Sequence, residues 1–142
     1  MSELKKIDHL GWAFEPAEIP AVLEFFEKTF GVKEAFKEEV ADQKVITHFL
    51  DVGGVWIELL EPTSPDSNVA KWLTDKEGKK KKGFHHIAYE VADINAAIAK
   101  VKAAGQQMID EAPRPGANKQ LIAFVHPKST HGVMMELCQA AK

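Results

Sequence analysis

The chain has 142 residues, of which 45% are hydrophobic and 27% are charged, and its formal net charge is −3. Such a length and composition are typical of one globular domain, which can form a core without a disulfide or a metal. The negative charge argues against a nucleic-acid partner, because phosphate neutralisation needs a surplus of basic residues. No apolar run approaches the ~20 residues that a membrane helix needs.

The N-terminal segment and the cysteine content bear on location. Residues 1–6 lack the apolar stretch of a secretory signal peptide. Cys138 is the only cysteine, which excludes an internal disulfide and fits a reducing compartment. We therefore expect a cytoplasmic protein that binds neither nucleic acid nor membrane.

The first half of the chain predicts a strand, a helix and a hairpin. The strand covers residues 7–14. Apolar residues at helical spacing follow, at Val22, Phe25, Phe26 and Phe30. Residues 45–52 and 55–60 read as the two strands of a hairpin around a Gly-Gly turn. Ser67 is then suited to cap a short helix.

The second half predicts the same kinds of element in the same order. Residues 84–91 form an apolar strand, and Asp93 is placed to cap the helix that follows. After a loop rich in proline and glycine, residues 121–125 and 133–138 read as strands. The order of strand, helix and strands therefore occurs twice.

The two halves also match residue by residue. The first predicted strand aligns with the strand that opens the second half, which places His9 over His86. The second strand of the hairpin aligns with the final strand, which places Glu58 over Glu136. The two offsets agree to within one residue, so the repeat keeps its register.

This repeat predicts an α+β fold of two tandem βαβββ modules. Each module has an open apolar face, so the two are expected to pair about a pseudo-twofold axis and form a cleft-shaped, incomplete barrel of eight strands. We expect a single domain over residues 1–142, with one module at about 5–75 and the other at about 83–140.

Each module contributes one histidine on its first strand and one glutamate on its last strand. Two imidazoles and two carboxylates suit a divalent first-row metal, with positions open for water or substrate. A carboxylate inside a barrel is costly unless it is paired or bound to a metal. The alternative is that the glutamates face solvent and the histidines are structural. Recurrence at matched offsets favours a metal site formed by His9, Glu58, His86 and Glu136.

Several segments resemble the methylmalonyl-CoA epimerases of the vicinal-oxygen-chelate superfamily. The most specific are residues 57–67 and the turn at 126–129. Further similar segments are residues 8–9, 70–73, 85–88, 111–114, 124–125 and 136–137. The resemblance spans nearly the whole chain. It implies metal-dependent epimerisation of (2R)- and (2S)-methylmalonyl-CoA by proton exchange at C2, through a metal-stabilised enolate.

The resemblance also implies roles for particular residues. The metal ligands of the family fall on His9, Glu58, His86 and Glu136. Many family members have glutamine where Glu58 stands. Glu136 is implied as one catalytic base, and Glu58 or a bound water is a candidate for the second. Some epimerases carry a further glutamate where this chain has Thr47, and a threonine cannot take a proton from carbon.

The remaining expectations concern substrate and partners. Lys128 and Ser129 are expected at the mouth of the cleft, where they would bind the free carboxylate or a CoA phosphate; an ordinary β-turn is the alternative. Arg114, the only arginine, could take a phosphate or simply lie at the surface. The resemblance implies an isomerase of propionate metabolism, acting on an acyl-CoA as a homodimer, with Co²⁺, Mn²⁺, Ni²⁺ or Zn²⁺ bound.

Two other functions fit parts of the pattern. Lactoylglutathione lyase, from the same superfamily, can also use two histidines and two glutamates, so the ligands alone do not decide. A metal-free small-molecule binding protein of the same fold is the second alternative. The segments at 61–67 and 126–129 favour the epimerase, and the complete ligand set argues against the binding protein.

Overall fold

The computed structural model describes residues 2–140. These residues form two compact units. One unit comprises the residues up to His9 together with those from His86 onward, and the other comprises Leu10–His85. The strands β1 (Leu4–Ala13) and β5 (Gly83–Val91) each contribute residues to both units.

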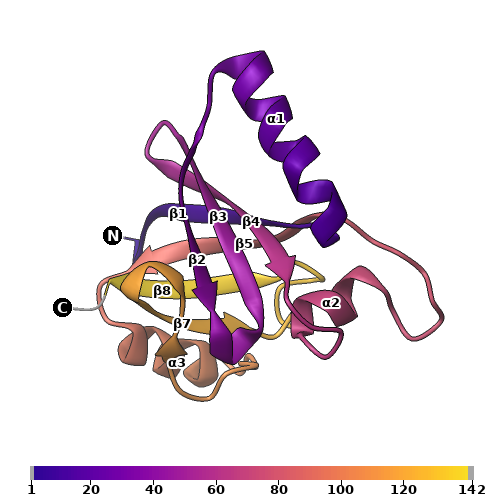
Figure 1. Ribbon diagram of the computed structural model, residues 1–142. Helices are drawn as coiled ribbons and strands as arrows, with labels where there is room; N and C mark the ends of the chain where they lie inside the picture. The colour runs from indigo at the N-terminus through magenta and orange to yellow at the C-terminus, as the bar shows by residue number, and fades with distance from the viewer. Residues whose placement is uncertain (1, 141–142) are drawn as a thin grey trace. The chain divides into compact units, whose positions relative to one another are not determined.

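The unit Leu10–His85 is built on a sheet with the strand order β2-β3-β4-β1, in which β2, β3 and β4 run side by side (Figure 1). Its elements are α1 (Ile19–Phe30), β2 (Glu34–Val40), β3 (Val45–Val52), β4 (Val55–Pro62) and α2 (Asn68–Leu73). Short 3-10 turns cover Pro16–Glu18 and Ala41–Gln43. Gly53 and Gly54 join β3 to β4 with φ angles of 63° and 89°, which a tight hairpin turn requires.

Helix α1 is amphipathic. It packs with β3 and β4 in a cluster whose buried members are Ile19, Leu50, Ile57 and Leu59. Phe25 and Phe30 remain 54% and 66% exposed. Gly31 ends the helix with a φ of 69°, and its N–H donates to the carbonyl of Glu27 at 3.0 Å.

The other unit contains the strands in the order β1-β5-β8-β7-β6. Besides β5, its elements are α3 (Ile94–Ala103), β6 (Arg114–Pro115), a 3-10 turn at Ala117–Lys119, β7 (Gln120–Val125) and β8 (Met135–Ala140). Strand β8 is parallel to β5 and antiparallel to β7. Helix α3 lies along β7 and β8 (Figure 1), where Ile94 and Ile98 join Val125 and Leu137 in a buried cluster. Asp93 caps α3 by accepting the N–H of Ala96 at 3.1 Å.

The α+β class and the two βαβββ modules are confirmed. The chain order is β1-α1-β2-β3-β4 and then β5-α3-β6-β7-β8. Within each module the second, third, fourth and first strands are neighbours in that order. The sequence did not predict β2, a mostly exposed strand rich in charged residues, or β6, which has only two residues. Among the described residues, no helix is both long and apolar enough to cross a membrane.

Candidate metal centre

Strand register brings the second histidine and the second glutamate together. Ala88 on β5 pairs with Glu136 on β8, which in turn pairs with Phe124 on β7. His86 lies two residues before Ala88, so its side chain shares the same face of the sheet. Both polar groups are buried, with His86 4% and Glu136 3% exposed. The ring of Phe124 meets the ring of His86 edge to face at 5.3 Å.

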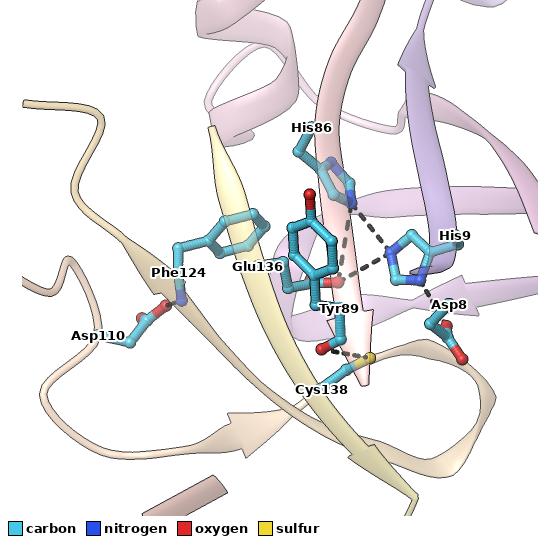
Figure 2. Close-up of polar contacts among 8 residues, drawn as sticks. All are labelled: Asp8, His9, His86, Tyr89, Asp110, Phe124, Glu136 and Cys138. Atoms are coloured by element: carbon cyan, nitrogen blue, oxygen red, sulfur yellow. Dashed lines mark hydrogen bonds and ion pairs between the residues drawn. The ribbon is translucent and has the colours of Figure 1, made fainter. Parts of the chain in front are cut away.

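His9 on β1 completes a three-residue cluster. Its Nε2 is 3.0 Å from Nε2 of His86 and 2.8 Å from Oε2 of Glu136. The same Glu136 oxygen is 3.8 Å from Nε2 of His86. Figure 2 shows the three side chains pointing toward one another from β1, β5 and β8. All three belong to the unit that begins and ends the chain.

Asp8 contacts the His9 nitrogen on the side of the ring away from this cluster (Figure 2). Its Oδ2 lies 2.7 Å from Nδ1 of His9, and both side chains are buried. Burial raises the pKa of Asp8, but hydrogen bonds from His9 and Gln120 and the charge of Lys6 outweigh it, so the pKa lies below its usual value. An ionised Asp8 accepts a hydrogen bond from the Nδ1–H of His9, and in that tautomer Nε2 carries the lone pair.

The cluster fits a divalent cation. Oε2 of Glu136 is buried and accepts no hydrogen bond among the described residues. Leaving such an oxygen without a positive partner is costly. A first-row cation holds nitrogen and oxygen ligands at about 2.1 Å, so two ligands at right angles lie about 3 Å apart. The separations of 3.0 and 2.8 Å around His9 match that geometry, and the three residues form a potential metal-binding group.

Glu58, the fourth expected ligand, lies in the other unit and is described there by itself. It is 5% exposed and pairs with Phe49 in the β3–β4 ladder. Thr47, two residues before Phe49, shares that face and is 2% exposed. Neither Glu58 nor Glu136 faces solvent, so the solvent-facing interpretation of the two glutamates is wrong.

The two expected substrate-binding residues lie in the turn between β7 and β8. Lys128 is exposed, and its backbone N–H donates to Nδ1 of His126 at 3.0 Å. The Ser129 hydroxyl accepts the backbone N–H of Gln107 at 2.8 Å, which ties this turn to the chain that follows α3. A structural role for Ser129 is therefore established, while the Lys128 ammonium remains at the surface.

The sequence analysis did not predict the contacts that surround the cluster. Phe124 packs against His86, and Asp110 accepts the N–H of Phe124 at 2.8 Å. Asp110 also accepts a hydrogen bond from Nε of Arg114 at 3.0 Å. Gln120 donates to Asp8, and the thiol of Cys138 donates to the carbonyl of Tyr89 at 3.5 Å (Figure 2). Most of these contacts join segments that are distant in sequence, so no local sequence pattern predicted them.

Two further histidines, His48 and His85, contact other side chains. His48 lies between two carboxylates, with Nδ1 2.5 Å from Glu34 and Nε2 2.8 Å from Glu61. His85 packs edge-on against Trp72 at 4.9 Å, and burial lowers the pKa of its imidazole to about 4. Both rings have partners of their own within the unit Leu10–His85.

The comparisons with known proteins agree with this fold. The family model of the glyoxalase/bleomycin resistance protein/dioxygenase superfamily matches residues 8–124, a span that includes His9 and His86. The chain therefore belongs to this superfamily, whose members typically bind a divalent metal.

Relatives identify the branch of the superfamily. The chain is 32% identical over 135 residues to the ethylmalonyl-CoA/methylmalonyl-CoA epimerase of Cereibacter sphaeroides, covering 94% of this chain and 97% of that protein. It is 36% identical over 136 residues to the uncharacterised protein YqjC of Bacillus subtilis, covering 96% and 93%. The chain belongs to the methylmalonyl-CoA epimerase family.

Solved structures lead to the same family. A variant of the Streptomyces coelicolor methylmalonyl-CoA epimerase in complex with 2-nitronate-propionyl-CoA matches with a TM-score of 0.86 and 37% identity. The match covers 97% of this chain and 96% of that one. A methylmalonyl-CoA epimerase in complex with methylmalonyl-CoA and NH₄⁺ matches with the same values.

Proposed function

We propose that this protein interconverts (2R)- and (2S)-methylmalonyl-CoA by proton exchange at C2, with a divalent cation held by His9, His86, Glu136 and Glu58. One observation carries the proposal. In a chain related over almost its whole length to methylmalonyl-CoA epimerases, two imidazole nitrogens and a buried carboxylate oxygen converge within 3.8 Å.

The reaction explains why such a site is needed. The C2 proton lies between a thioester and a carboxylate, and removing it develops negative charge on the adjacent oxygens. When bound, the cation would supply fixed positive charge for those oxygens. The protein contributes a site from which water is largely excluded, because His86 and Glu136 are buried and the ring of Phe124 covers His86. Electrostatic stabilisation is stronger in such a site than in water.

Glu136 is the proposed base for one face of C2. Its carboxylate is 3% exposed and its Oε2 accepts no hydrogen bond among residues 2–140. Nε2 of His9 lies 2.8 Å from the same oxygen. The ladder with Ala88 and Phe124 holds the side chain on the same face as His86, so a proton taken from substrate arrives beside the ligand histidines.

Glu58 is the proposed acid/base for the other face and the fourth ligand. This assignment rests on the sequence repeat, which places Glu58 over Glu136, and on its burial at 5% exposure. Thr47, where some family members carry a glutamate, cannot accept a proton from carbon. A second carboxylate is then needed for exchange on both faces, and Glu58 is a buried carboxylate on the face that Thr47 shares.

Substrate contacts and assembly complete the proposal. Lys128 and Ser129 are proposed to bind the free carboxylate or a CoA phosphate, and the exposed ammonium of Lys128 suits either anion. We also propose a cytoplasmic homodimer of propionate metabolism. The single buried cysteine, Cys138, is compatible with a reducing compartment. Light scattering of the purified protein measures its oligomeric state directly.

The test is incubation of the metal-loaded protein with each epimer in deuterated water. Parallel samples carry Co²⁺, Mn²⁺, Ni²⁺ or Zn²⁺. We expect deuterium to enter C2 and the two epimers to interconvert, as followed by mass spectrometry and chiral analysis. No exchange with any of the four ions would overturn the proposal. The hemithioacetal of methylglyoxal and glutathione is the control substrate, and turnover of it alone would instead indicate lactoylglutathione lyase.

A further inference from the structure

A hydrogen-bonded chain of three side chains leads to the candidate metal centre from behind His9. The side-chain amide of Gln120, at the start of β7, donates to Asp8. Asp8 in turn accepts the Nδ1 proton of His9 at 2.7 Å. Gln120 and Asp8 are each 8% exposed, and His9 is 3% exposed. Figure 2 shows Asp8 on the side of the His9 ring that points away from His86 and Glu136.

We propose that Asp8 and Gln120 are positioning residues for the metal centre. They hold His9 in the tautomer whose Nε2 lone pair points at the cation site, and they orient its ring. A carboxylate that accepts the second N–H of a ligand histidine also raises the basicity of the ligating nitrogen. The inference rests on the proposed cation site, but it makes a separate claim about the metal-free protein.

The contact between Asp8 and His9 does not follow from their adjacency in sequence. Neighbouring side chains on a strand normally point to opposite faces. Here both side chains are buried and lie within hydrogen-bond distance of each other. Burying an ionised carboxylate is costly unless its oxygens are hydrogen-bonded, and Gln120 and His9 supply those bonds. The hydrogen bonds therefore run without a break from the amide of Gln120 through the carboxylate of Asp8 to the imidazole of His9.

Comparison of the two modules shows that a carboxylate partner of this kind is specific to His9. Asp8 aligns with His85, the residue before His86. His85 offers no carboxylate to its neighbour, and its ring instead packs against Trp72 at 4.9 Å. The two ligand histidines therefore have different preceding residues. Only at His9 does that position carry a carboxylate that can select a tautomer.

The decisive variant is Asp8→Asn. An asparagine keeps the size of the side chain but removes the charge, and its amide can donate to Nδ1 as readily as accept from it. We expect affinity for Co²⁺, measured by chelator competition, to fall about 10- to 100-fold. Gln120→Met, which removes the amide donor to Asp8, is expected to give a smaller loss in the same direction.

Asp110→Asn is the matched control. Asp110 lies in the same unit and also accepts partly buried hydrogen bonds, from the backbone of Phe124 and from Arg114. We expect this variant to lower the free energy of unfolding. Its Co²⁺ affinity should stay within about twofold of that of the wild type, because substitutions away from the site have small effects.

A second readout does not depend on metal. Nitrogen-15 NMR of metal-free protein at alkaline pH reports the tautomer of His9, assigned with a His9→Gln variant. We expect the Nδ1–H form in the wild type and a mixture in Asp8→Asn. A wild-type Nε2–H form, or an unchanged tautomer and affinity in Asp8→Asn, would overturn the inference. If instead wild-type protein shows the Nδ1–H form but binds no cation, the proposed function fails while the positioning role stands.

Discussion

The two βαβββ modules share an order of elements but differ in how their helices attach to the sheet. Helix α1 starts without a side-chain cap and leaves Phe25 and Phe30 exposed. Helix α3 is capped by Asp93 and buries Ile94 and Ile98. The second strand also differs, because β2 has seven residues and β6 has two.

The modules agree where the candidate chemistry lies. Each first strand carries a buried histidine and each last strand a buried glutamate, namely His9 with Glu58 and His86 with Glu136. The helix and the second strand of a module can therefore differ while the strands that carry the candidate ligands stay alike. This comparison can be tested with substitutions in the strands that carry the candidate ligands and, separately, with substitutions in the helices.

The largest expected effect is on proton exchange. Glu136→Gln keeps the size and an oxygen donor but removes the basic carboxylate, so exchange at C2 should fall about 10²- to 10⁴-fold. The measurement is deuterium wash-in from each epimer separately, with metal content determined in parallel. Wild-type exchange from both epimers in Glu136→Gln would show that Glu136 is not the base.

Glu58→Gln is the matched variant in the other module. If the two glutamates serve opposite faces of C2, each variant should lose exchange from a different epimer. Glutamine can still act as an oxygen ligand, so the metal content of both variants should stay close to that of the wild type. Retention of both exchange reactions in Glu58→Gln would restrict Glu58 to a ligand role.

The next effect is on stability and compares the two helices. Ile98→Ala removes a side chain of α3 that is 4% exposed, so the free energy of unfolding should fall by about 3 kcal/mol. Phe25→Ala removes a larger side chain of α1 that is 54% exposed, and should cost less than about 1 kcal/mol. Urea unfolding followed by circular dichroism measures both. Equal losses would contradict the difference in helix burial.

The third effect is a pH dependence that arises from His85. Burial penalises its charged form, so its pKa is about 4 in the folded protein against about 6.5 when unfolded. Between these values the unfolded chain binds more protons, and the free energy of unfolding therefore falls as the pH drops. We expect a loss of about 2 kcal/mol between pH 7 and pH 4 from this residue, after allowance for its partial exposure.

The measurement is urea unfolding of metal-free protein at several pH values. His85→Phe keeps an aromatic ring beside Trp72 and cannot be protonated, so its stability should decline less than that of the wild type. His131→Asn, at an exposed turn position, is the control and should follow the wild-type curve. Parallel curves for wild type and His85→Phe would contradict a depressed pKa.

The smallest effect concerns helix caps. Asp93→Ala removes the side chain that accepts the N–H of Ala96, and should lower the free energy of unfolding by about 1 kcal/mol. Glu18 occupies the equivalent position of α1 but makes no capping hydrogen bond. Glu18→Ala should therefore cost less than half as much, even though it also removes an exposed pair with Lys82. The loss of stability in each variant can be measured by thermal denaturation, and the larger loss is expected for Asp93→Ala.

The sequence predicted most of the regular structure, for physical reasons that can be traced. Ser67 and Asp93 were recognisable as caps because their short side chains accept the N–H three residues later, and the structure confirms both. The hairpin at residues 45–62 followed from two apolar runs around Gly53-Gly54. Strand β2 was missed because five of its seven residues are exposed, so no alternation of buried and exposed residues marks it.

The repeat within the sequence determined that His9, His86 and Glu136 belong to one set, because matched offsets in two equivalent modules bring equivalent strands into register. Only the tertiary structure placed Nε2 of His9 3.0 Å from Nε2 of His86 and joined Gln120 to Asp8. Such contacts depend on how strands distant in the chain lie beside one another. Local propensity acts over a few residues and carries no information on those distances.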